Sequence, residues 1–393
     1  MKYQYDHLII GAGMAGEAAA QAIHAVAPDA SIGMLGAENH PPYARPPLSK
    51  ALWKGEAEND IWYPVADTGA QLHMGRRAVS IDADAHRVRD EHGDEYHYGK
   101  LLFATGGSPR RLAFAGDRVL AYRTIDDYHR LREIAVKGAH IAVVGGGFIG
   151  CEIAAGLAMN GVKVSMIFPE DRLGARVYPQ GLSAFIGDYY REHGIEIHSG
   201  RLVKGGAQHG DKVSLELDDG STLEVDGVVA GMGIVLDVEL ARSTGATVDN
   251  GIHVDECMRS TVPDIFAAGD VANFPSQALG KRVRVEHEDA ALSTGRIAGL
   301  AMAGKPEPYG QLPFFYSDLF DLGYEATGTL DNRLELVEDW VTPNREGVVY
   351  YTEAGRVRGV LLWNVWDRLD AARALIAEPG PHDAASLRGR IRG

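Results

Sequence analysis

Cysteine is nearly absent from this chain of 393 residues, which contains only Cys151 and Cys257. The two are far apart in sequence and fit neither a C-x-x-C pair nor the spacing of a metal site. So little cysteine suits a reducing compartment, where thiols stay reduced. We interpret Cys151 as a small buried hydrophobe, and a redox thiol is the alternative.

Long hydrophobic runs are also missing. No apolar stretch reaches the roughly 18 residues that a membrane-spanning helix needs. The opening MKYQYDHLIIGAGMAG has a short apolar run that leads into a glycine turn, which resembles neither a signal peptide nor a membrane anchor. We therefore predict a cytoplasmic protein without a membrane partner.

Acidic residues outnumber basic ones, so the formal net charge is −15. This balance argues against nucleic acid as a partner. The one basic cluster, SLRGRIRG at 386–393, is interpreted as a solvated chain end that frays. With 45% hydrophobic and 24% charged residues, the chain is expected to form two or three globular domains.

Two segments repeat the order strand, glycine turn, helix, strand, at residues 7–36 and 139–168. In such a unit the first glycine permits a tight turn, the second admits a pyrophosphate to the backbone, and the third packs helix on strand. The helix N-terminus adds free N–H groups and a positive dipole end. Two units predict two dinucleotide sites. Their glycines are Gly11, Gly13 and Gly16 in the first and Gly145, Gly147 and Gly150 in the second.

An acid is expected beyond the second strand of each unit, where it can bind ribose hydroxyls. Glu38 is the candidate in the first unit, with a solvated loop acid as the alternative reading. In the second unit Phe168 occupies the usual position and Glu170 follows two residues later. Glu170 would repel a 2′-phosphate, so NADH is favoured over NADPH.

Two further turns suggest that the first site holds a flavin. TVPDIFAAGD at 261–270 delivers Ala268, Gly269 and Asp270 at the end of a strand. Small residues allow close backbone approach, and a carboxylate can bind a ribityl hydroxyl. FATGG at 103–107 repeats this logic with Ala104, Thr105 and Gly106. We expect a bound FAD in one site and an exchanging NADH in the other.

The predicted fold class is α/β, with two Rossmann-like dinucleotide-binding domains and a small C-terminal α+β domain. The FAD-binding domain is expected to be discontinuous, over 1–120 and 248–312. The NADH-binding domain is expected over 121–247. Aromatic and alternating strand-like segments from residue 313 predict the C-terminal domain over 313–393.

Five segments carry a family resemblance, namely PYARPPLSKALW, VGGGFIGCEIA, FPEDRLGARVYP, RVEHEDAALSTGRIAG and YSDLFDLGYEATG. Over nearly its whole length the chain resembles the FAD- and NAD(P)-dependent pyridine nucleotide-disulfide oxidoreductase superfamily. Within it, the segments resemble the apoptosis-inducing factor and ferredoxin reductase branch. Disulfide reductases carry a redox cysteine pair soon after the first nucleotide unit, where this chain has PPYARPPLSK. Electrons are therefore expected to pass from the flavin directly to an acceptor.

The resemblance also implies roles for individual residues. Lys50 would lie beside the flavin ring with Glu152 as its partner, since a fixed ammonium stabilises charge that develops on the ring; the alternative is a surface lysine and a helix-face glutamate. His287 would lie near the flavin as a proton relay, or would be paired with its neighbours. The implied FAD contacts include Arg45, Pro46, Glu286 and Tyr316, the last in place of a usual tryptophan. The implied NADH contacts include Phe148, Glu170, Arg176 and Gly233. Trp363 and Trp366 are expected to be core or flavin-shielding aromatics.

Two functions follow from this interpretation. The first is an FAD-containing NADH oxidoreductase whose acceptor is a ferredoxin or rubredoxin, a quinone or oxygen. The alternative is a redox-responsive protein like apoptosis-inducing factors, in which a long-lived NADH–flavin charge-transfer complex alters oligomeric state or partner binding. The expected partners are NADH and a small redox protein. A homodimer is one assembly that this interpretation allows, and no metal is expected.

Overall fold

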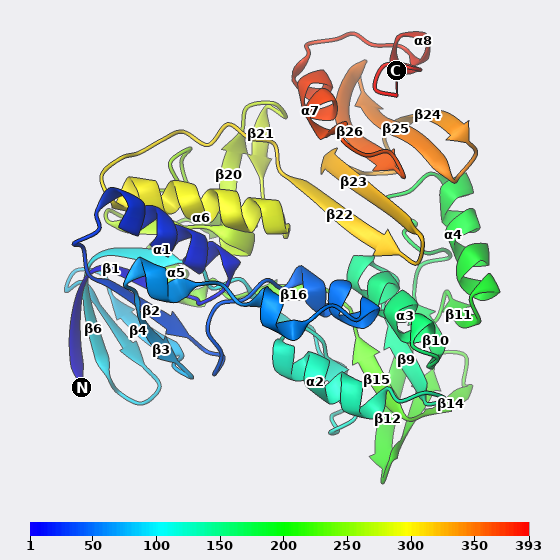
Figure 1. Ribbon diagram of the computed structural model, residues 1–393, viewed down its shortest axis with the longest axis horizontal. Helices are drawn as coiled ribbons and strands as arrows, with labels where there is room; N and C mark the ends of the chain where they lie inside the picture. Colours follow the sequence, from blue (N-terminus) through cyan, green and yellow to red (C-terminus); the bar gives the residue numbers. More distant parts are fainter. Residues whose placement is uncertain (393) are drawn as a thin grey trace. The chain divides into compact units, whose positions relative to one another are not determined.

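The computed structural model describes residues 1–392, and the chain divides into two compact units (Figure 1). Unit 1 comprises Met1–Ala44, Glu58–Ser108 and Val235–Pro313. Unit 2 comprises Arg45–Ala57, Pro109–Ile234 and the chain from Phe314 onward. The α/β fold class is confirmed. The three predicted domain ranges remain a prediction, and the two compact units divide the chain differently at residues 45–57, 109–120 and 235–247.

Unit 1 is built on a seven-stranded sheet in the order β3-β2-β1-β6-β5-β4, with β19 also paired to β6. Its central strands are parallel, and the C-terminal parts of β1 and β6 are buried, as expected of apolar runs such as HLII. Helices α1 and α6 pack closely because Gly295 has no side chain; a Cβ there would lie 2.3 Å from the Ala15 carbonyl oxygen. The elements are β1 Lys2–Ile10, α1 Met14–Val26, β2 Ile32–Gly36, β3 Gln71–Met74, β4 Ala78–Asp82, β5 Arg87–Asp90, β6 Glu95–Phe103, β19 Ile265–Ala267 and α6 Glu288–Met302.

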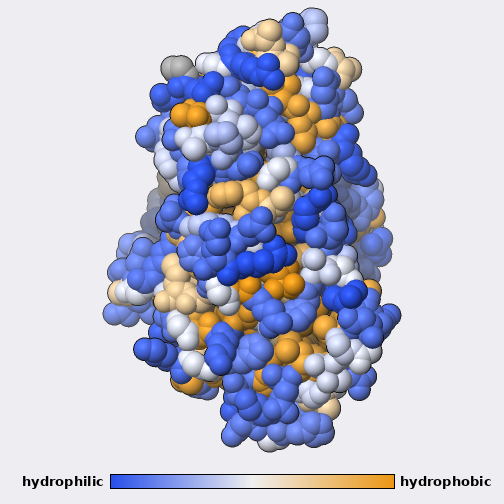
Figure 2. All heavy atoms as spheres, turned by 90° about the vertical axis from the view of Figure 1, so that its right-hand side faces the viewer, coloured by the Kyte–Doolittle hydropathy of each residue, from blue (hydrophilic) through white to orange (hydrophobic). Residues whose placement is uncertain are grey.

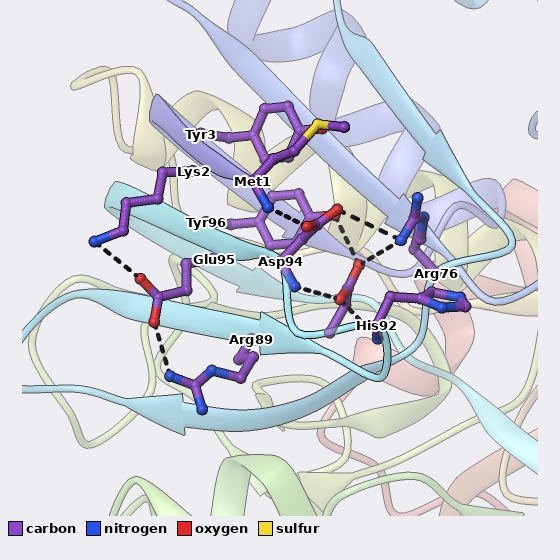
Figure 3. A network of polar contacts seen from close by, with 10 residues as sticks. Met1, Lys2, Tyr3, Arg76, Arg89, His92, Asp94, Glu95 and Tyr96 are labelled. Carbon is purple, nitrogen blue, oxygen red and sulfur yellow. Dashed lines mark hydrogen bonds and ion pairs between the residues drawn. The ribbon is translucent and has the colours of Figure 1, made fainter.

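Ion pairs tie the first strand of this sheet to the turn before β6 (Figure 3). The Met1 ammonium bonds to Asp94, and the Lys2 ammonium lies 3.4 Å from Glu95. Arg76 lies 3.5 Å from the same Asp94 carboxylate. These contacts hold the start of β1 beside the start of β6, where Lys2 pairs with Glu95 across the two strands.

Unit 2 contains a second, wholly parallel sheet in the order β11-β10-β9-β15-β8. Its central strands β9 and β15 are almost wholly buried and rich in valine, as is typical of parallel sheets covered on both faces. The elements are β8 Val119–Ala121, α2 Ile125–Ile134, β9 His140–Val144, α3 Phe148–Met159, β10 Lys163–Phe168, α4 Gln180–Glu192, β11 Ile195–Ser199 and β15 Gly227–Ala230.

The C-terminal part of unit 2 is an antiparallel sheet in the order β22-β23-β26-β25-β24, with α7 packed on β23 and β26. β24 alternates in part between buried and exposed side chains, whereas β25 and β26 are mostly buried. The elements are β22 Phe314–Leu319, β23 Leu322–Gly328, β24 Glu335–Thr342, β25 Glu346–Glu353, β26 Arg356–Trp363, α7 Leu369–Ala377 and α8 Ala384–Leu387.

The basic tail was predicted to fray, and for the described residues that prediction is wrong. Leu387 and Ile391 are buried, and the Arg392 guanidinium donates to the Asp339 carboxylate at 2.8 Å. The Gly389 amide donates to the same carboxylate at 2.8 Å. Arg392 therefore pairs with an acid of the sheet, whereas Arg388 and Arg390 are exposed. Residue 393 lies outside the described residues.

The smaller elements complete both units. Unit 1 also has the four-stranded sheet β17-β18-β20-β21, and unit 2 has the antiparallel meander β12-β13-β14. The remaining bounds are η1 Pro46–Leu48, η2 Ala51–Lys54, η3 Glu58–Ile61, η4 Val65–Thr68, β7 Gly107–Pro109, β12 Val203–His209, β13 Lys212–Leu217, β14 Thr222–Val225, β16 Ile234–Leu236, α5 Glu239–Ser243, β17 Val248–Asp249, β18 Gly251–His253, η5 Gly269–Val271, β20 Ala272–Ser276 and β21 Lys281–Val283.

The proline-rich segment 45–57 is fixed within unit 2. The Tyr122 hydroxyl and the Trp53 indole N–H both donate to the Leu48 carbonyl, at 2.6 and 2.9 Å. The Asn160 amide donates to the Trp53 carbonyl at 2.9 Å. Gly156 on α3 leaves room for the Trp53 ring, since a Cβ would lie 3.0 Å from it. Prolines limit the backbone conformers of this segment, and these contacts then hold it in place.

Hydrophilic side chains predominate on the face drawn in Figure 2, with apolar ones scattered among them. Of the two tryptophans near the end of the chain, Trp363 is fully buried. Trp366 is 50% exposed and is therefore not a core residue, so for it only the alternative of a flavin-shielding aromatic stays a prediction. No helix within residues 1–392 is long and apolar enough to cross a membrane.

Candidate functional site

The first glycine turn lies at one edge of the unit 1 sheet, where three parallel strands end in register. Ile10 of β1 pairs with Phe103 of β6, which pairs with Ala267 of β19. The turns that follow these strands therefore meet at the same edge. They carry Gly11 to Gly16, Ala104 to Gly106, and Gly269 with Asp270.

The glycines of the first turn differ in how much room a side chain would have. Gly11 has φ +115°, and a Cβ there would lie 2.1 Å from the Ala104 carbonyl oxygen. A Cβ on Gly16 would lie 2.1 Å from the Gly11 carbonyl oxygen. A Cβ on Gly13 would meet nothing within 4 Å. Gly11 and Gly16 thus close the turn, and Gly13 leaves bare backbone at the start of α1, which suits an approaching pyrophosphate of FAD.

The other predicted residues of unit 1 are held around this edge. Glu38 accepts a hydrogen bond from the Tyr43 hydroxyl at 2.6 Å, so it is not a freely solvated acid. The Thr105 hydroxyl donates to the Asp237 carbonyl at 2.7 Å, and the Gly106 carbonyl accepts from the Asp237 amide at 3.1 Å. The Gly269 amide donates to the buried Thr294 hydroxyl at 2.9 Å. Backbone and side-chain bonds therefore fix the second and third of these turns.

Arg284 connects the Asp270 turn to the residues before α6. Its guanidinium lies 2.9 Å from the Glu286 carboxylate and donates to the Asp270 carbonyl at 3.4 Å. His287 is the N-cap residue of α6, and burial lowers its pKa to about 4. The imidazole is therefore neutral at pH 7, which suits an uncharged contact better than a cationic one.

The second glycine turn repeats the first in unit 2. Gly145 has φ +122°, and a Cβ there would lie 2.3 Å from the Gly231 carbonyl oxygen. A Cβ on Gly150 would lie 2.1 Å from the Gly145 carbonyl oxygen, whereas one on Gly147 would meet nothing within 4 Å. The start of α3 therefore also presents bare backbone toward a dinucleotide phosphate.

A cavity of about 490 Å³ opens beside this turn. Most of the predicted NADH residues line it: Gly145, Gly147, Phe148, Glu170, Arg176 and Gly233. Two of these form an ion pair, because the Arg176 guanidinium lies 2.9 Å from the Glu170 carboxylate. Tyr178 and Arg201 also line the cavity, and the sequence reasoning did not select them. Gly150 and Glu152 are buried residues of α3 and are not among the lining residues.

Lys50 and Glu152, 102 residues apart, form a buried ion pair. The Lys50 Nζ lies 2.9 Å from Glu152 Oε2, with side-chain exposures of 10% and 2%. Ser49 donates to the same oxygen at 2.6 Å, and Ser317 donates to Oε1 at 2.6 Å. The lysine ammonium also lies 5.0 Å from the ring centroid of Tyr316, within cation–π range. This excludes the alternative of a surface lysine and an unconnected glutamate.

The predicted FAD residues divide between the two units. Arg45, Pro46, Lys50 and Tyr316 belong to unit 2 together with the NADH set, and the others belong to unit 1. Arg45 donates to the Arg123 carbonyl at 3.0 Å. The sequence reasoning missed Ser49 and Ser317, although Ser49 precedes Lys50 directly and Ser317 follows Tyr316. The only sequence signal for the two serines is that each is adjacent to a candidate residue. Their shared acceptor, Glu152, lies on a helix far away in the sequence.

Both cysteines are buried and unpaired. Burial raises the pKa of the Cys151 thiol to about 12, and the pKa of Cys257 is raised by burial as well. Neither thiol is therefore a thiolate at neutral pH, which favours the small-hydrophobe interpretation of Cys151. Among residues 1–392, no group of three or more His, Cys, Asp or Glu side chains is arranged to hold a metal ion.

Comparison with known proteins gives consistent matches. Residues 5–295 match the family model described as pyridine nucleotide-disulphide oxidoreductase. The chain is 36% identical to the ferredoxin–NAD(+) reductase component of the anthranilate 1,2-dioxygenase system of Burkholderia cepacia, over 97% of this chain and 96% of that protein. It is 32% identical to apoptosis-inducing factor 1, mitochondrial, of Dictyostelium discoideum, over 95% and 78%. The putidaredoxin reductase–putidaredoxin covalent complex superposes with a TM-score of 0.89 at 30% identity, covering 96% of this chain and 94% of that chain.

Proposed function

Because the chain belongs to the pyridine nucleotide-disulphide oxidoreductase family and is an enzyme that uses FAD and NAD(H), we propose that it is the NADH-dependent reductase of a small redox protein such as a ferredoxin. In the overall reaction NADH gives up two electrons and a proton as hydride and becomes NAD⁺. Two molecules of a one-electron acceptor are then reduced, and one proton is released to solvent.

The proposal rests on one observation: both units have a glycine turn that suits a dinucleotide, and the chain has no thiol that could carry electrons. Each unit has one bare glycine, Gly13 or Gly147, at a helix start that can receive a pyrophosphate. Both cysteines are buried and protonated, so the chain has no dithiol to relay electrons. A reductase with these parts must deliver electrons directly. The names of the Burkholderia relative and of the putidaredoxin reductase complex support a protein acceptor.

Bound FAD supplies the chemistry of accepting a hydride and releasing electrons one at a time. Gly13 and the first turn of α1 would bind its pyrophosphate, and Glu38 would accept from ribose hydroxyls. Lys50 would place a fixed positive charge at the ring, held in position by Glu152. Gly147, Phe148 and Glu170 would bind and orient NADH in the unit 2 cavity.

Two glycine substitutions test which unit binds which cofactor. In Gly13→Ala the new methyl group meets nothing in the fold, so we expect normal stability but loss of FAD during purification. In Gly147→Ala we expect FAD to be retained at full occupancy while KM for NADH rises about tenfold or more. A tenfold rise corresponds to a loss of about 1.4 kcal/mol of binding free energy. The reverse pattern, with Gly13→Ala affecting only NADH, would refute the assignment.

A panel of acceptors tests the reaction itself. NADH oxidation is measured at a fixed enzyme concentration with a ferredoxin, a rubredoxin, a quinone or oxygen as the only acceptor. The proposal expects the highest kcat/KM with an iron–sulfur protein. The similarity to apoptosis-inducing factor 1 supports a second candidate, a redox-responsive binding protein. That function would instead show slow turnover with every acceptor and a long-wavelength absorbance with NADH that persists in air.

A further inference from the structure

The Glu152 carboxylate has more hydrogen-bond donors than its ion pair requires. Ser317 donates to Oε1, while Ser49 and Lys50 donate to Oε2. Glu152 and both serines are 5% exposed or less. A buried carboxylate without donors would be costly, and these three hydrogen bonds also fix how the carboxylate is oriented. The two serines therefore hold Oε2 toward Lys50 in addition to the ion pair itself.

Ser317 belongs to the C-terminal sheet and is connected there to two buried tyrosines. Ser317 on β22 is the cross-strand partner of Tyr324 on β23, and their side chains are hydrogen-bonded. Tyr324 accepts from the Tyr178 hydroxyl at 2.9 Å. Ser317 in turn donates to Glu152 Oε1. The hydroxyls of Tyr178, Tyr324 and Ser317 thus connect the C-terminal sheet to the Glu152 carboxylate.

Packing holds this chain rigidly and keeps water out. Tyr324 is fully buried and stacks on Trp363 at 5.5 Å with an interplanar angle of 16°. Tyr178 is 4% exposed, and Gly174 leaves room for its ring, since a Cβ there would lie 2.2 Å from it. Burial raises the pKa of both tyrosines well above 10, so both hydroxyls keep their protons as donors.

We propose that Ser317 and Tyr324 are positioning residues, which act through Glu152 to hold the Lys50 ammonium in one place. Neither residue contacts the cavity that we assign to NADH, whereas Tyr178 lines its wall. The C-terminal sheet thus does more than complete the core of unit 2: it supplies the donors that set the ion pair. The proposal rests on the proposed function for its kinetic consequence, because that function places Lys50 at the flavin ring.

Three variants of the full-length, FAD-loaded protein test it. Ser317→Ala and Tyr324→Phe each remove one hydroxyl of the chain and leave the surrounding packing in place. Tyr190→Phe is the matched control, since Tyr190 is also fully buried and donates its hydroxyl to α3, but to the Cys151 carbonyl at 3.0 Å. The first readout is the shift of the urea midpoint, which does not depend on turnover. Each substitution is made in the parent and in Lys50→Met/Glu152→Leu, which lacks both charges.

If Ser317 and Tyr324 act through Glu152, their midpoint shifts in the charge-free background should be less than half of those in the parent. The Tyr190→Phe shift should be equal in both backgrounds. Equal shifts for Ser317→Ala or Tyr324→Phe in the two backgrounds would overturn the proposal, because the hydroxyls would then stabilise the fold independently of Glu152.

The second readout separates rate from binding. In single-turnover reduction by NADH, Ser317→Ala and Tyr324→Phe should lower the limiting rate about three- to tenfold while the apparent Kd for NADH stays within twofold. Tyr190→Phe should change neither value by more than twofold. A limiting rate equal to that of the parent in both test variants would overturn the positioning role. An unchanged rate in Lys50→Met alone would instead refute the proposed function of Lys50, and the midpoint test would still decide whether the hydroxyls act through Glu152.

Discussion

Removing the Lys50 ammonium should destabilise the protein strongly, and removing both charges should destabilise it less. Lys50→Met keeps the length of the side chain but leaves the Glu152 carboxylate, with 2% exposure, as a buried charge without a cation. Breaking a buried ion pair from one side typically costs about 3–5 kcal/mol. The bonds from Ser49 and Ser317, each at 2.6 Å, continue to stabilise the carboxylate. We therefore expect a loss near the lower end, about 3 kcal/mol in the free energy of unfolding.

The double variant Lys50→Met/Glu152→Leu removes the unpaired charge. Its remaining cost is the loss of an acceptor for two serine hydroxyls, about 1 kcal/mol each when partly compensated. Ser49 still has the Pro46 carbonyl at 3.4 Å, and Ser317 still has Tyr324 as a partner. The double variant should thus be more stable than Lys50→Met alone, by about 1–2 kcal/mol.

Urea unfolding followed by tryptophan fluorescence measures both values. Trp53 and Trp363 are buried in unit 2, where the ion pair lies, so their emission reports on the relevant unit. A loss below about 0.5 kcal/mol in Lys50→Met would show that the pair is not desolvated as the structure indicates. A double variant less stable than the single one would show that the charge itself is not the cause.

Three further predictions concern other parts of the site. Gly11→Ala should destabilise the fold by at least about 1 kcal/mol, measured by urea unfolding, because the methyl group would meet the Ala104 carbonyl at a positive φ. Between pH 6.5 and about 4 the unfolded state binds a proton at His287 that the folded state does not, so the free energy of unfolding should fall by about 3 kcal/mol as the pH falls through this window. In a pH series of unfolding curves, a His287→Asn variant should lose this part of the pH dependence. An unchanged pH dependence in the variant would contradict the burial of His287. Glu170→Gln should lower the ratio of kcat/KM for NADH over NADPH about tenfold, because the acid that opposes a 2′-phosphate is gone; an unchanged ratio would remove Glu170 from the specificity site.

Local patterns account for what could be predicted from the sequence. The glycine turns and their flanking strands were recognised because each lies within about 30 contiguous residues, and turn, helix start and strand end follow from neighbouring side chains. The structure places these segments as expected, including the Gly13 and Gly147 positions that stay open. The pairing of Lys50 with Glu152 came from a family resemblance, since 102 residues separate them.

Long-range packing accounts for what could not be predicted. The donors to Glu152 come from two segments 268 residues apart, Ser49 and Ser317, and no period or spacing connects them. The tail was expected to be solvated because its arginines dominate the pattern. Leu387 and Ile391 are buried instead, and Asp339 on β24 neutralises Arg392. Whether an isolated apolar residue is buried depends on the surface it meets, which the tail sequence does not contain.

The way in which the chain alternates between the two units affects the order in which the protein can fold during synthesis. It passes from one unit to the other five times, after Ala44, Ala57, Ser108, Ile234 and Pro313. Unit 1 lacks helix α6 until residue 302 has left the ribosome, and unit 2 lacks its whole C-terminal sheet until the end of translation. Residues 45–57, made early, must wait for partners on α2, α3 and β22. Nascent chains of this protein should therefore depend on chaperones that shield apolar surface for longer than a chain with contiguous domains would need.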